Sequence, residues 1–339
     1  MKVFILLILP FIAFGQYDPK ENEYRHFSVI SKSDTIHYHV YAKGELTTKQ
    51  GLIVFFHGSG SEPLLRIVSK VDTLKENING EVKIKTQKYK MLYSSIPFDL
   101  DRIPETYALV LISKKGIPFL LKSENFKTPE SFYKTESLDY RVWQGDNVIK
   151  DILKNRLKNP QKVVVIGHSE GSDVVAKLAT INKQITHVGY WAGGGNTQYY
   201  DFALSIRKDV QNGKISEEDG RKQLESLIGE VRNIENDPQN IQKFWMGHTY
   251  KRWSSFTEPP IDHLLKIEKP IFVAVGALDK SVPIESSYLI PFEFIRHKKQ
   301  NLTFRVYPEY DHSFNRSNPN GQISYEFMNV FEEFMKWIK

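Results

Sequence analysis

The sequence predicts an α/β fold with a mostly parallel sheet that is covered by helices on both faces. Short apolar runs rich in valine, isoleucine and leucine alternate along the 339 residues with stretches of helical periodicity. Continuous apolar runs are typical of strands buried on both faces, and their alternation with helices is the pattern of parallel sheets. The hydrophobic content of 40% and the aromatic content of 13% are those of a globular chain. At this length, the chain can form one core with an insertion.

Composition excludes several functional classes. The chain has no cysteine, which rules out disulfides, thiolate catalysis and cysteine zinc sites. The formal net charge is +6, and acidic and basic residues are interleaved. The longest basic stretches, Lys114-Lys115 and Arg296–Lys299, are too short for a nucleic-acid surface, so we expect no nucleic-acid partner. Lys114 and Lys115 follow a predicted strand, where we expect a solvated loop rather than a site for an acidic substrate.

The first residues have the pattern of a secretory signal peptide. Lys2 precedes an apolar run from Val3 to Ile12, and Ala13-Phe14-Gly15 supplies small residues at the spacing that signal peptidases read. We therefore predict a signal peptide over 1–15, cleaved after Gly15, and a secreted or periplasmic protein. An uncleaved N-terminal anchor is the alternative. No later stretch is apolar for long enough to span a membrane, so we expect no integral membrane span after signal removal.

The elements that precede the central motif are predicted from their periodicity. Alternating residues from His26 to Tyr41 predict a hairpin, and the apolar run 52–56 predicts a buried strand before a Gly/Ser loop at 57–61. The segment 64–102 is ambiguous, with a helix expected near 64–74 followed by an irregular excursion. A strand at 108–112 and a helix at 139–158 complete this part.

The central motif is Gly-x-Ser-x-Gly between a strand and a helix. The apolar run 163–166 leads into Gly167, Ser169 and Gly171, and a helical pattern follows at 173–179. This is the sequence of a nucleophile elbow, in which a sharp turn needs small neighbours and exposes the serine hydroxyl at a helix N-terminus. We therefore predict that Ser169 is a catalytic nucleophile.

After a strand at 185–191, the β pattern stops between Asn196 and Lys266. Residues 199–210 have helical periodicity, and Ser216 with Asp219 resembles a capping box before a second helix. That helix is expected to bury Leu224, Leu227, Ile228 and Val231. The predicted organisation is a core over 16–195, a helical cap insertion over 196–266, and the rest of the core over 267–339.

The stretch 244–253 is unusually aromatic. Such a cluster serves equally well as the small core of an insertion or as the wall of an apolar pocket. On the second interpretation, the substrate-binding candidates are Phe244, Trp245, Tyr250 and Trp253.

Partners for a serine nucleophile follow later strands. Asp279 comes after the apolar run 271–275, and His312 comes shortly after the predicted strand 302–306. A serine needs a base to take its proton and a carboxylate to orient that base, and the order Ser, Asp, His fits this fold class. Asp311 is the competing acid, but a neighbour in sequence is badly placed to face the His312 ring. We therefore prefer Asp279, and interpret Asp173 as a helix N-terminal charge.

Stabilisation of an oxyanion requires two hydrogen-bond donors. The backbone N–H of Glu170 is expected to be one, and the loop around Ser59 is expected to supply the other, because Gly58 and Gly60 allow close backbone approach. We expect His57 to brace this loop rather than to transfer protons.

These motifs together resemble the α/β-hydrolase superfamily. The resemblance rests on Gly167–Gly171, His57–Gly60, the Asp279 loop and His312, and covers about 52–339 apart from the insertion. It implies an α/β-hydrolase fold with an eight-stranded, mostly parallel sheet and a helical cap. It also implies a Ser-His-Asp hydrolase that uses no metal or cofactor.

The expected function is a secreted serine hydrolase that cleaves a carboxylic ester of a small molecule through an acyl-enzyme intermediate. A serine peptidase or aminoacyl hydrolase of the prolyl-oligopeptidase type is the first alternative. The short segment before Leu52 leaves no room for the β-propeller usual in that group. A non-catalytic binding protein on the same scaffold is the second alternative.

Overall fold

The computed structural model describes residues 23–78, 81–122 and 125–339, so the predicted signal peptide lies outside the described residues. An eight-stranded sheet with strand order β1-β2-β6-β3-β8-β9-β12-β13 forms the centre of the molecule. The strands at its first edge are antiparallel, and those from β6 to β13 are parallel. The strands are β1 (Arg25–Ser31), β2 (Asp34–Tyr41), β3 (Gly51–Phe56), β6 (Tyr107–Ile112), β8 (Lys162–His168), β9 (His187–Trp191), β12 (Ile271–Gly276) and β13 (Leu302–Tyr307).

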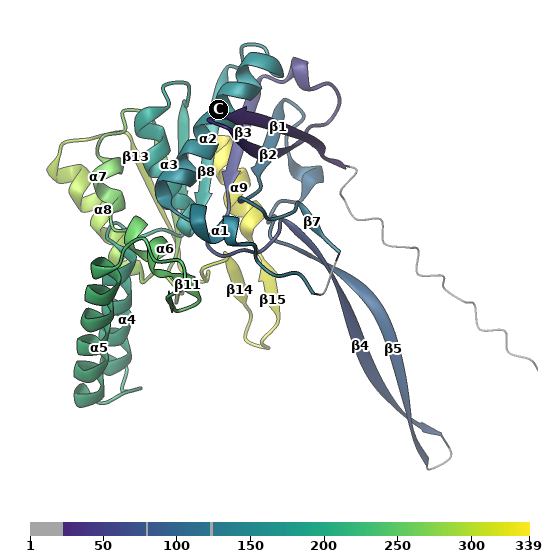
Figure 1. The fold of residues 1–339 in the computed structure, drawn as a ribbon, viewed down its shortest axis with the longest axis vertical. Helices are drawn as coiled ribbons and strands as arrows, with labels where there is room; N and C mark the ends of the chain where they lie inside the picture. The colour runs from purple at the N-terminus through teal and green to yellow at the C-terminus, as the bar shows by residue number, and fades with distance from the viewer. Residues whose placement is uncertain (1–22, 79–80, 123–124) are drawn as a thin grey trace, which may run out of the picture.

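Helices cover both faces of the sheet (Figure 1). Alternation along β3 explains its continuous apolar sequence, because Val54 and Phe56 belong to one core cluster while Ile53 and Phe55 belong to the other. One face packs against α2 (Leu138–Asn155), α3 (Glu170–Ile181) and α8 (Ile284–Arg296), and the opposite face packs against α9 (Phe327–Trp337).

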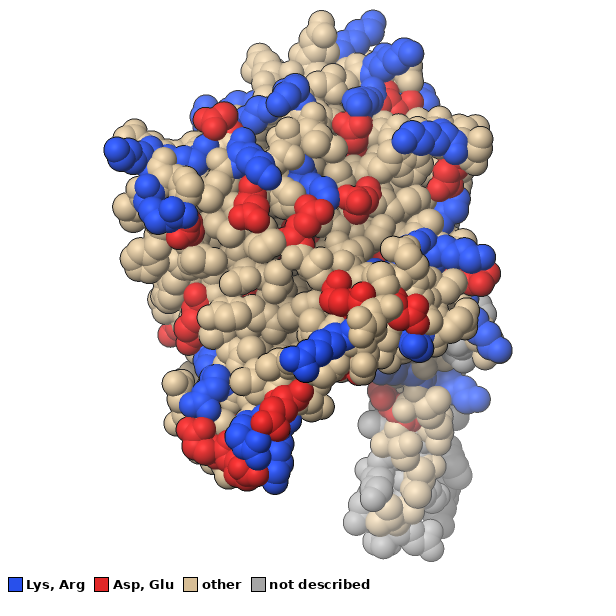
Figure 2. Space-filling model, turned by 60° about the vertical axis from the view of Figure 1, so that its left-hand side comes forward, with Lys and Arg blue, Asp and Glu red and all other residues tan. Residues whose placement is uncertain are grey.

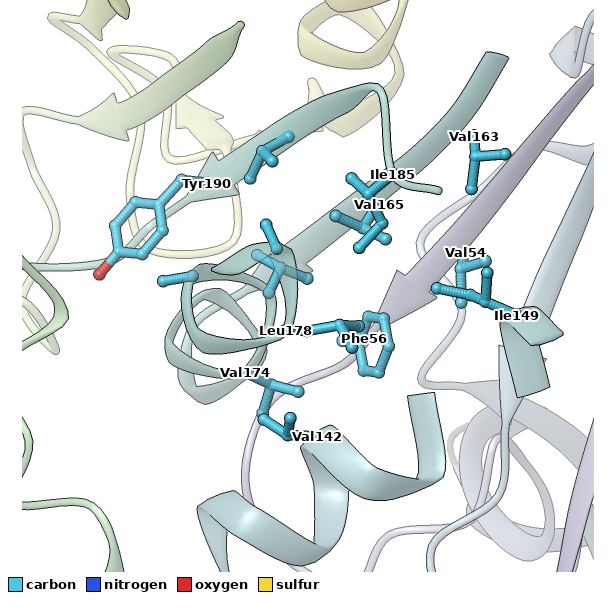
Figure 3. Packing of buried hydrophobic residues seen from close by; sticks show 14 of the residues in the cluster. Val54, Phe56, Val142, Ile149, Val163, Val165, Val174, Leu178, Ile185 and Tyr190 are labelled. Carbon is cyan, nitrogen blue, oxygen red and sulfur yellow. The ribbon is translucent and has the colours of Figure 1, made fainter. Parts of the chain in front are cut away.

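The first cluster holds the motif helix close to the sheet. Figure 3 shows Phe56 of β3 and Leu178 of α3 meeting beside α2. A Cβ atom added to Gly145 of α2 would lie 2.5 Å from Phe56 Cζ, so only glycine lets the helix approach this closely. This packing fixes α3, and with it the turn that precedes α3.

The helix expected near 64–74 is wrong. Leu65–Ile78 forms the strand β4, which pairs antiparallel with β5 (Glu81–Ser94) in a long ribbon that projects from the body and is joined at its base by β7 (Leu120–Leu121). Apolar residues in this segment recur at helical spacing, which misled the interpretation. Its β-branched residues, among them Ile67, Val68 and Val71, favour a strand once a partner strand is available.

The segment between β9 and β12 is mainly helical. It contains α4 (Gln198–Gln211), α5 (Glu217–Asn236), β10 (Phe244–Trp245), β11 (His248–Thr249), α6 (Tyr250–Ser255) and α7 (Pro260–Leu264). Helices α4 and α5 form a hairpin that projects from the body (Figure 1). The Ser216 Oγ accepts a hydrogen bond from the Asp219 backbone N–H at 3.1 Å, which caps α5. Ile261 and Leu264 of α7 pack into the first core cluster, so the end of the segment lies against the sheet-covering helices.

The expectation for the apolar side of α5 is correct only in part. Leu227 is buried, whereas Leu224 and Val231 are half-buried and Ile228 is 44% exposed. A helix that projects from the body has fewer neighbours to cover its apolar side, and this accounts for the exposed Ile228.

The surface carries both signs of charge. On the face of the molecule shown in Figure 2, lysine and arginine side chains lie beside aspartate and glutamate side chains. The shorter elements of the described chain include α1 (Glu130–Thr135), β14 (Asn315–Ser317) and β15 (Ile323–Tyr325). Within the described part of the chain, none of the helices is both long and apolar enough to cross a bilayer.

Candidate active site

Ser169 occupies a strained turn between β8 and α3. Its φ of 57° and ψ of −130° lie in a region that residues with a side chain rarely adopt. A Cβ atom on Gly167 would lie 2.0 Å from the Gly171 carbonyl oxygen, and one on Gly171 would lie 1.9 Å from the Phe56 carbonyl oxygen. The turn therefore exists only with glycine at both positions, as expected for a sharp elbow at the end of a strand.

Asp279 and His312 lie together on loops that follow β12 and β13. The His312 Nδ1 is 2.7 Å from the Asp279 Oδ2. The other Asp279 oxygen accepts backbone N–H hydrogen bonds from Ser281 at 2.7 Å and Val282 at 2.8 Å, which fixes the carboxylate. The imidazole is thus held by an acid that is itself oriented by its own loop.

Asp311 has a different environment. Its Oδ1 accepts hydrogen bonds from the backbone N–H groups of Ser313 at 2.9 Å and Asn315 at 2.8 Å. This carboxylate shapes the turn that carries His312, and it is Asp279 that contacts the ring.

The His312 loop is fastened to the residue before Ser169. The ring of His168 donates from Nε2 to the His312 carbonyl oxygen at 2.8 Å. Burial, with a further contribution from His312, lowers the pKa of His168 to about 4, so the ring is neutral at pH 7. Among the described residues, the Ser169 hydroxyl makes no hydrogen bond to the His312 ring.

A cavity of about 200 Å³ opens beside Ser169. The core contributes Ser59 and Glu170 to its wall, and the helical segment contributes Met246, His248, Arg252 and Trp253 among others. Polar and apolar groups both line it, which differs from the apolar pocket that one of the two sequence interpretations of 244–253 predicts.

Of the four aromatic residues proposed to bind substrate, only Trp253 lines this cavity. Trp245 and Tyr250 pack with Trp253 in a small cluster of the helical segment, and the rings of Trp245 and Trp253 are 4.9 Å apart. Phe244 is 50% exposed and lies against Tyr133. Trp245, Tyr250 and Phe244 therefore lie in the interior or on the outer surface of the helical segment and do not line the cavity.

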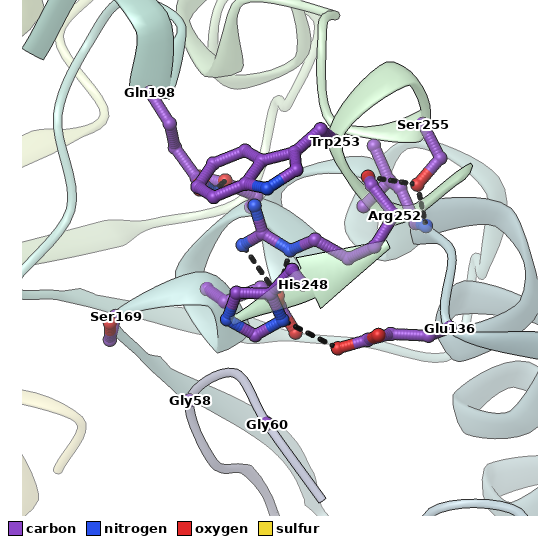
Figure 4. A network of polar contacts seen from close by, with 12 residues as sticks. Gly58, Gly60, Glu136, Ser169, Gln198, His248, Arg252, Trp253 and Ser255 are labelled. Carbon is purple, nitrogen blue, oxygen red and sulfur yellow. Dashed lines mark hydrogen bonds and ion pairs between the residues drawn. The ribbon is translucent and has the colours of Figure 1, made fainter. Parts of the chain in front are cut away.

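A buried charged cluster surrounds the residue that follows Ser169. The Glu170 carboxylate accepts from Arg141 Nη1 at 2.6 Å and from Arg252 Nε and Nη2 at 2.9 and 2.7 Å, while Lys114 Nζ lies 4.0 Å away. Burial alone would raise the pKa of Glu170, but the charges of Arg252, Lys114 and Arg141 outweigh it and hold the pKa far below its usual range. Figure 4 shows Arg252 reaching from α6, with the ring of Trp253 over its guanidinium group at 4.2 Å.

The same cluster holds the loop after β3. Lys114 Nζ donates to the carbonyl oxygens of Gly58 at 2.6 Å and Gly60 at 2.8 Å, and Arg141 Nη2 donates to that of His57 at 2.7 Å. Lys114 is buried, so the expectation of a solvated lysine pair is wrong for this residue. Burial, with the nearby Arg141, lowers the pKa of Lys114 to about 7. Its neighbour Lys115 forms an ion pair with Asp34.

The sequence interpretation did not find this cluster. Lys114, Arg141 and Arg252 come from the loop after β6, from α2 and from α6. One sequence signal pointed to the burial of Arg141. This residue directly precedes Val142, which belongs to the periodic apolar pattern of the helix. A second contact between the helical segment and the core joins His248 Nδ1 to Glu136 Oε1 at 3.0 Å.

Metal binding has no evident place at this site. Within the described ranges, no group of three or more histidine, cysteine, aspartate or glutamate side chains is arranged to hold a metal ion.

Comparison with known proteins gives one match to a family model. Residues 244–339, which include Asp279 and His312, match the Dienelactone hydrolase family. No curated protein matches the sequence at a significant level.

Solved structures resemble this fold over most of the chain at low sequence identity. An acylaminoacyl peptidase from Pyrococcus horikoshii superposes with a TM-score of 0.55 at 13% identity, covering 93% of this chain and 41% of its own. A puromycin-hydrolyzing peptidase from Mycobacterium tuberculosis gives a TM-score of 0.50 at 14% identity, covering 86% of this chain and 36% of its own. This chain therefore spans less than half the length of both peptidases.

An esterase from Pyrococcus furiosus is closer in size. It superposes with a TM-score of 0.52 at 14% identity, covering 95% of this chain and 91% of its own. At such identities, the likeness establishes a shared fold, and the chemistry has to be argued from the residues themselves.

Proposed function

We propose that this chain, which has the α/β-hydrolase fold and belongs to that superfamily, is a serine hydrolase that cleaves a carboxylic ester through an acyl-enzyme intermediate. The observation that carries the proposal is the hydrogen bond of 2.7 Å between His312 and Asp279. The two residues lie on loops that follow β12 and β13 of the main sheet. Strand β8 of the same sheet leads into the strained turn of Ser169. A nucleophile, a base and an orienting acid are the three groups that activated-serine chemistry needs.

In the proposed reaction, the Ser169 hydroxyl attacks the ester carbonyl carbon while His312 takes its proton through Nε2. Asp279 accepts the Nδ1–H hydrogen bond, which selects the tautomer with a free Nε2 and stabilises the imidazolium that forms. His312 then gives the proton to the departing alcohol. Water, deprotonated by His312, attacks the acyl-Ser169 ester, and the acid product leaves with the hydroxyl restored.

The oxyanion formed in both steps would be bound by two backbone donors. The N–H of Glu170 lies at the N-terminus of α3, and the N–H of Ser59 lies on the loop after β3. Lys114 and Arg141 bond the carbonyl oxygens of that loop, and Arg141 also bonds the Glu170 carboxylate. These contacts favour a fixed separation of the two donors before substrate arrives.

A serine peptidase or aminoacyl hydrolase is the second candidate. Two of the solved structures that share the fold are peptidases, and the polar lining of the cavity suits an amide substrate as well as an ester. A non-catalytic binding protein on the same scaffold is the third candidate.

The proposal includes secretion and a cap. The apolar run before Gly15 supports export with cleavage at that point. Residues 196–266 are proposed to form a cap, because Met246, His248 and Arg252 of this segment line the cavity next to Ser169.

The test uses protein that begins at Gln16. A fluorophosphonate probe should label wild type and should not label Ser169→Ala. p-Nitrophenyl esters of graded chain length, run beside aminoacyl p-nitroanilides, should separate ester from amide cleavage. Ser169→Ala and His312→Ala should each lower turnover by about 10⁴-fold or more. Absence of labelling together with absence of turnover would favour the binding protein, and faster anilide cleavage would favour the peptidase.

A further inference from the structure

Two carboxylates lie at one side of the cavity that contains Ser169. Asp173 stands in the first turn of α3, and Asp201 stands in the first turn of α4, within the helical segment. Both line the same cavity as Ser169. Neither takes part in the proposed reaction, so their presence beside the nucleophile requires another explanation.

The hydrogen bonds of these carboxylates are incomplete. Asp173 Oδ2 accepts from Gln198 Nε2 at 3.1 Å. Its Oδ1 lies 3.4 Å from the Tyr190 hydroxyl, but that hydroxyl has a single proton and donates it to the Gly194 carbonyl oxygen at 2.6 Å. Asp201 is only 4% exposed, and its Oδ1 has no hydrogen-bond partner among the described residues. Buried carboxylates with free acceptor positions are costly in the absence of a ligand.

The charges around the pair are mainly negative. Burial raises the pKa of Asp201 to about 7, and the charges of Asp173 and Asp279 add to this shift, while the nearby Ser286 hydroxyl acts in the opposite direction. Burial is also the main cause that raises the pKa of Asp173 to about 7. Among the described residues that line the cavity, Arg252 is the one arginine or lysine, and it directs its Nε and Nη2 to Glu170. This side of the cavity therefore favours a positive charge.

Arg252 has a hydrogen-bond donor without a partner among the described residues, whereas the two carboxylates have free acceptor positions. This side chain is 2% exposed, and its Nη1 has no hydrogen-bond partner among the described residues. An unpaired donor on one wall and unpaired acceptors on another are suited to a small polar substrate. A cavity of about 200 Å³ with this lining is poorly suited to a long alkyl chain.

We propose that Asp173 and Asp201 bind a protonated amino group of the substrate, so that Ser169 acts on small esters or amides whose acyl or leaving group carries an ammonium. This inference rests on the proposed serine hydrolase function. An ammonium supplies both the charge and the donors that the two carboxylates lack, whereas a neutral hydroxyl supplies one donor and no charge. Two carboxylates alone provide fewer oxygen ligands than a Ca²⁺ or Mg²⁺ site normally uses.

Matched substrates test the charge directly. The methyl esters of alanine, lactate and propionate differ only in carrying an ammonium, a hydroxyl or a hydrogen at the same carbon. Dimethylaminoethyl acetate and 3-methylbutyl acetate form the matching pair for the alcohol side. At pH 7 we expect the ammonium ester of one series to have a kcat/KM about ten- to a hundredfold above that of its uncharged partner, the usual contribution of a hydrogen bond to a charged group.

Variants connect this preference to the carboxylates. Asp201→Asn and Asp173→Asn should each bring the ratio of kcat/KM for the preferred ammonium ester to kcat/KM for its uncharged partner down to about one. The matched control is Asp209→Asn, also on α4, whose side chain is 43% exposed and pairs with Lys214. This control should keep the wild-type preference. Fluorophosphonate labelling of each variant reports whether Ser169 is still intact.

A readout without turnover separates this inference from the proposed function. Propylammonium chloride should raise the Tm of wild type more than potassium chloride at the same concentration, and this difference should vanish in Asp201→Asn. Equal rates for charged and uncharged esters in both series would overturn the inference. If the preference lies in the acyl series, a lactate ester cleaved as fast as the alanine ester would also overturn it, because a hydroxyl would then replace the ammonium. Loss of labelling and of all ester cleavage, with amine binding retained, would instead refute the serine hydrolase and keep the amine site.

Discussion

Replacing Arg252 with methionine should destabilise the protein and slow catalysis at once. Arg252 is 2% exposed and gives two hydrogen bonds, at 2.9 and 2.7 Å, to the equally buried Glu170. Hydrogen bonds to charged groups contribute about 1.5–3 kcal/mol each, and breaking a buried ion pair costs about 3–5 kcal/mol. Arg141 continues to pair with Glu170 in the variant, so we expect the lower end, about 3 kcal/mol in the free energy of unfolding.

The effect on rate follows from the position of Glu170. Its backbone N–H is the proposed oxyanion donor, and loss of one such donor typically costs about 10²–10³ in kcat. Arg252→Met leaves the donor in place and removes one of its anchors, so we expect kcat for an uncharged ester to fall about tenfold and KM to change little. A change confined to KM would mean that Arg252 acts through binding alone.

The assay compares urea unfolding of Arg252→Met with that of Arg221→Met. Arg221 of α5 also donates hydrogen bonds to carboxylates, those of Glu218 and Glu225, but all three side chains are more than half exposed. Exposed ion pairs contribute about 0–1 kcal/mol, so the two variants should differ by at least about 2 kcal/mol. Equal destabilisation of the two variants would refute the reasoning that the buried cluster stabilises the site.

The remaining predictions concern the acid, the turn and pH. Asp279→Asn should lower kcat by about 10⁴-fold because the imidazole tautomer is lost, whereas Asp311→Asn should cost much less; the reverse order in steady-state kinetics would give the role to Asp311. Gly171→Ala should abolish soluble expression or fluorophosphonate labelling, since its Cβ would meet a β3 carbonyl oxygen at 1.9 Å. For His168, the folded pKa of about 4 lies below the unfolded 6.5, so unfolding takes up a proton between these values. Stability should thus fall by up to about 3 kcal/mol from pH 6.5 to pH 4, and this slope in urea titrations should be smaller in His168→Asn.

Local patterns carried most of the fold prediction. The apolar run of β3 predicts burial on both faces because every residue of such a strand meets one core or the other, which the clusters of Val54 and Phe55 illustrate. The β4–β5 ribbon was missed for the opposite reason. Its strands pair with each other outside the main sheet. The apolar residues of β4 happen to recur at helical spacing, and this local pattern contains no information about the partner strand β5.

Within the candidate site, sequence patterns predict the positions of those residues that directly follow strands. Ser169, Asp279 and His312 each follow a strand, and parallel strands bring their carboxyl ends to one edge of a sheet. The charged cluster could not be predicted in this way. Lys114 and Arg252 each look like a surface residue in sequence, and only the folded chain brings them to the same carboxylate.

The two ends of the helical segment are attached to neighbouring strands of the sheet, and this limits the entropy cost of closing the segment. The segment starts after β9 and returns at β12, and these two strands are parallel neighbours, with Val188 paired to Ile271. The sheet therefore fixes the start and the end of the segment independently of its length. Each doubling of a loop closed in this way costs only about 0.6 kcal/mol, so residues can be added or removed between 192 and 270 at little expense to the core wherever the buried contacts of Arg252, Ile261 and Leu264 are kept. Specificity in this molecule can thus diverge by length variation in one segment while the sheet and the Ser169 turn stay unchanged.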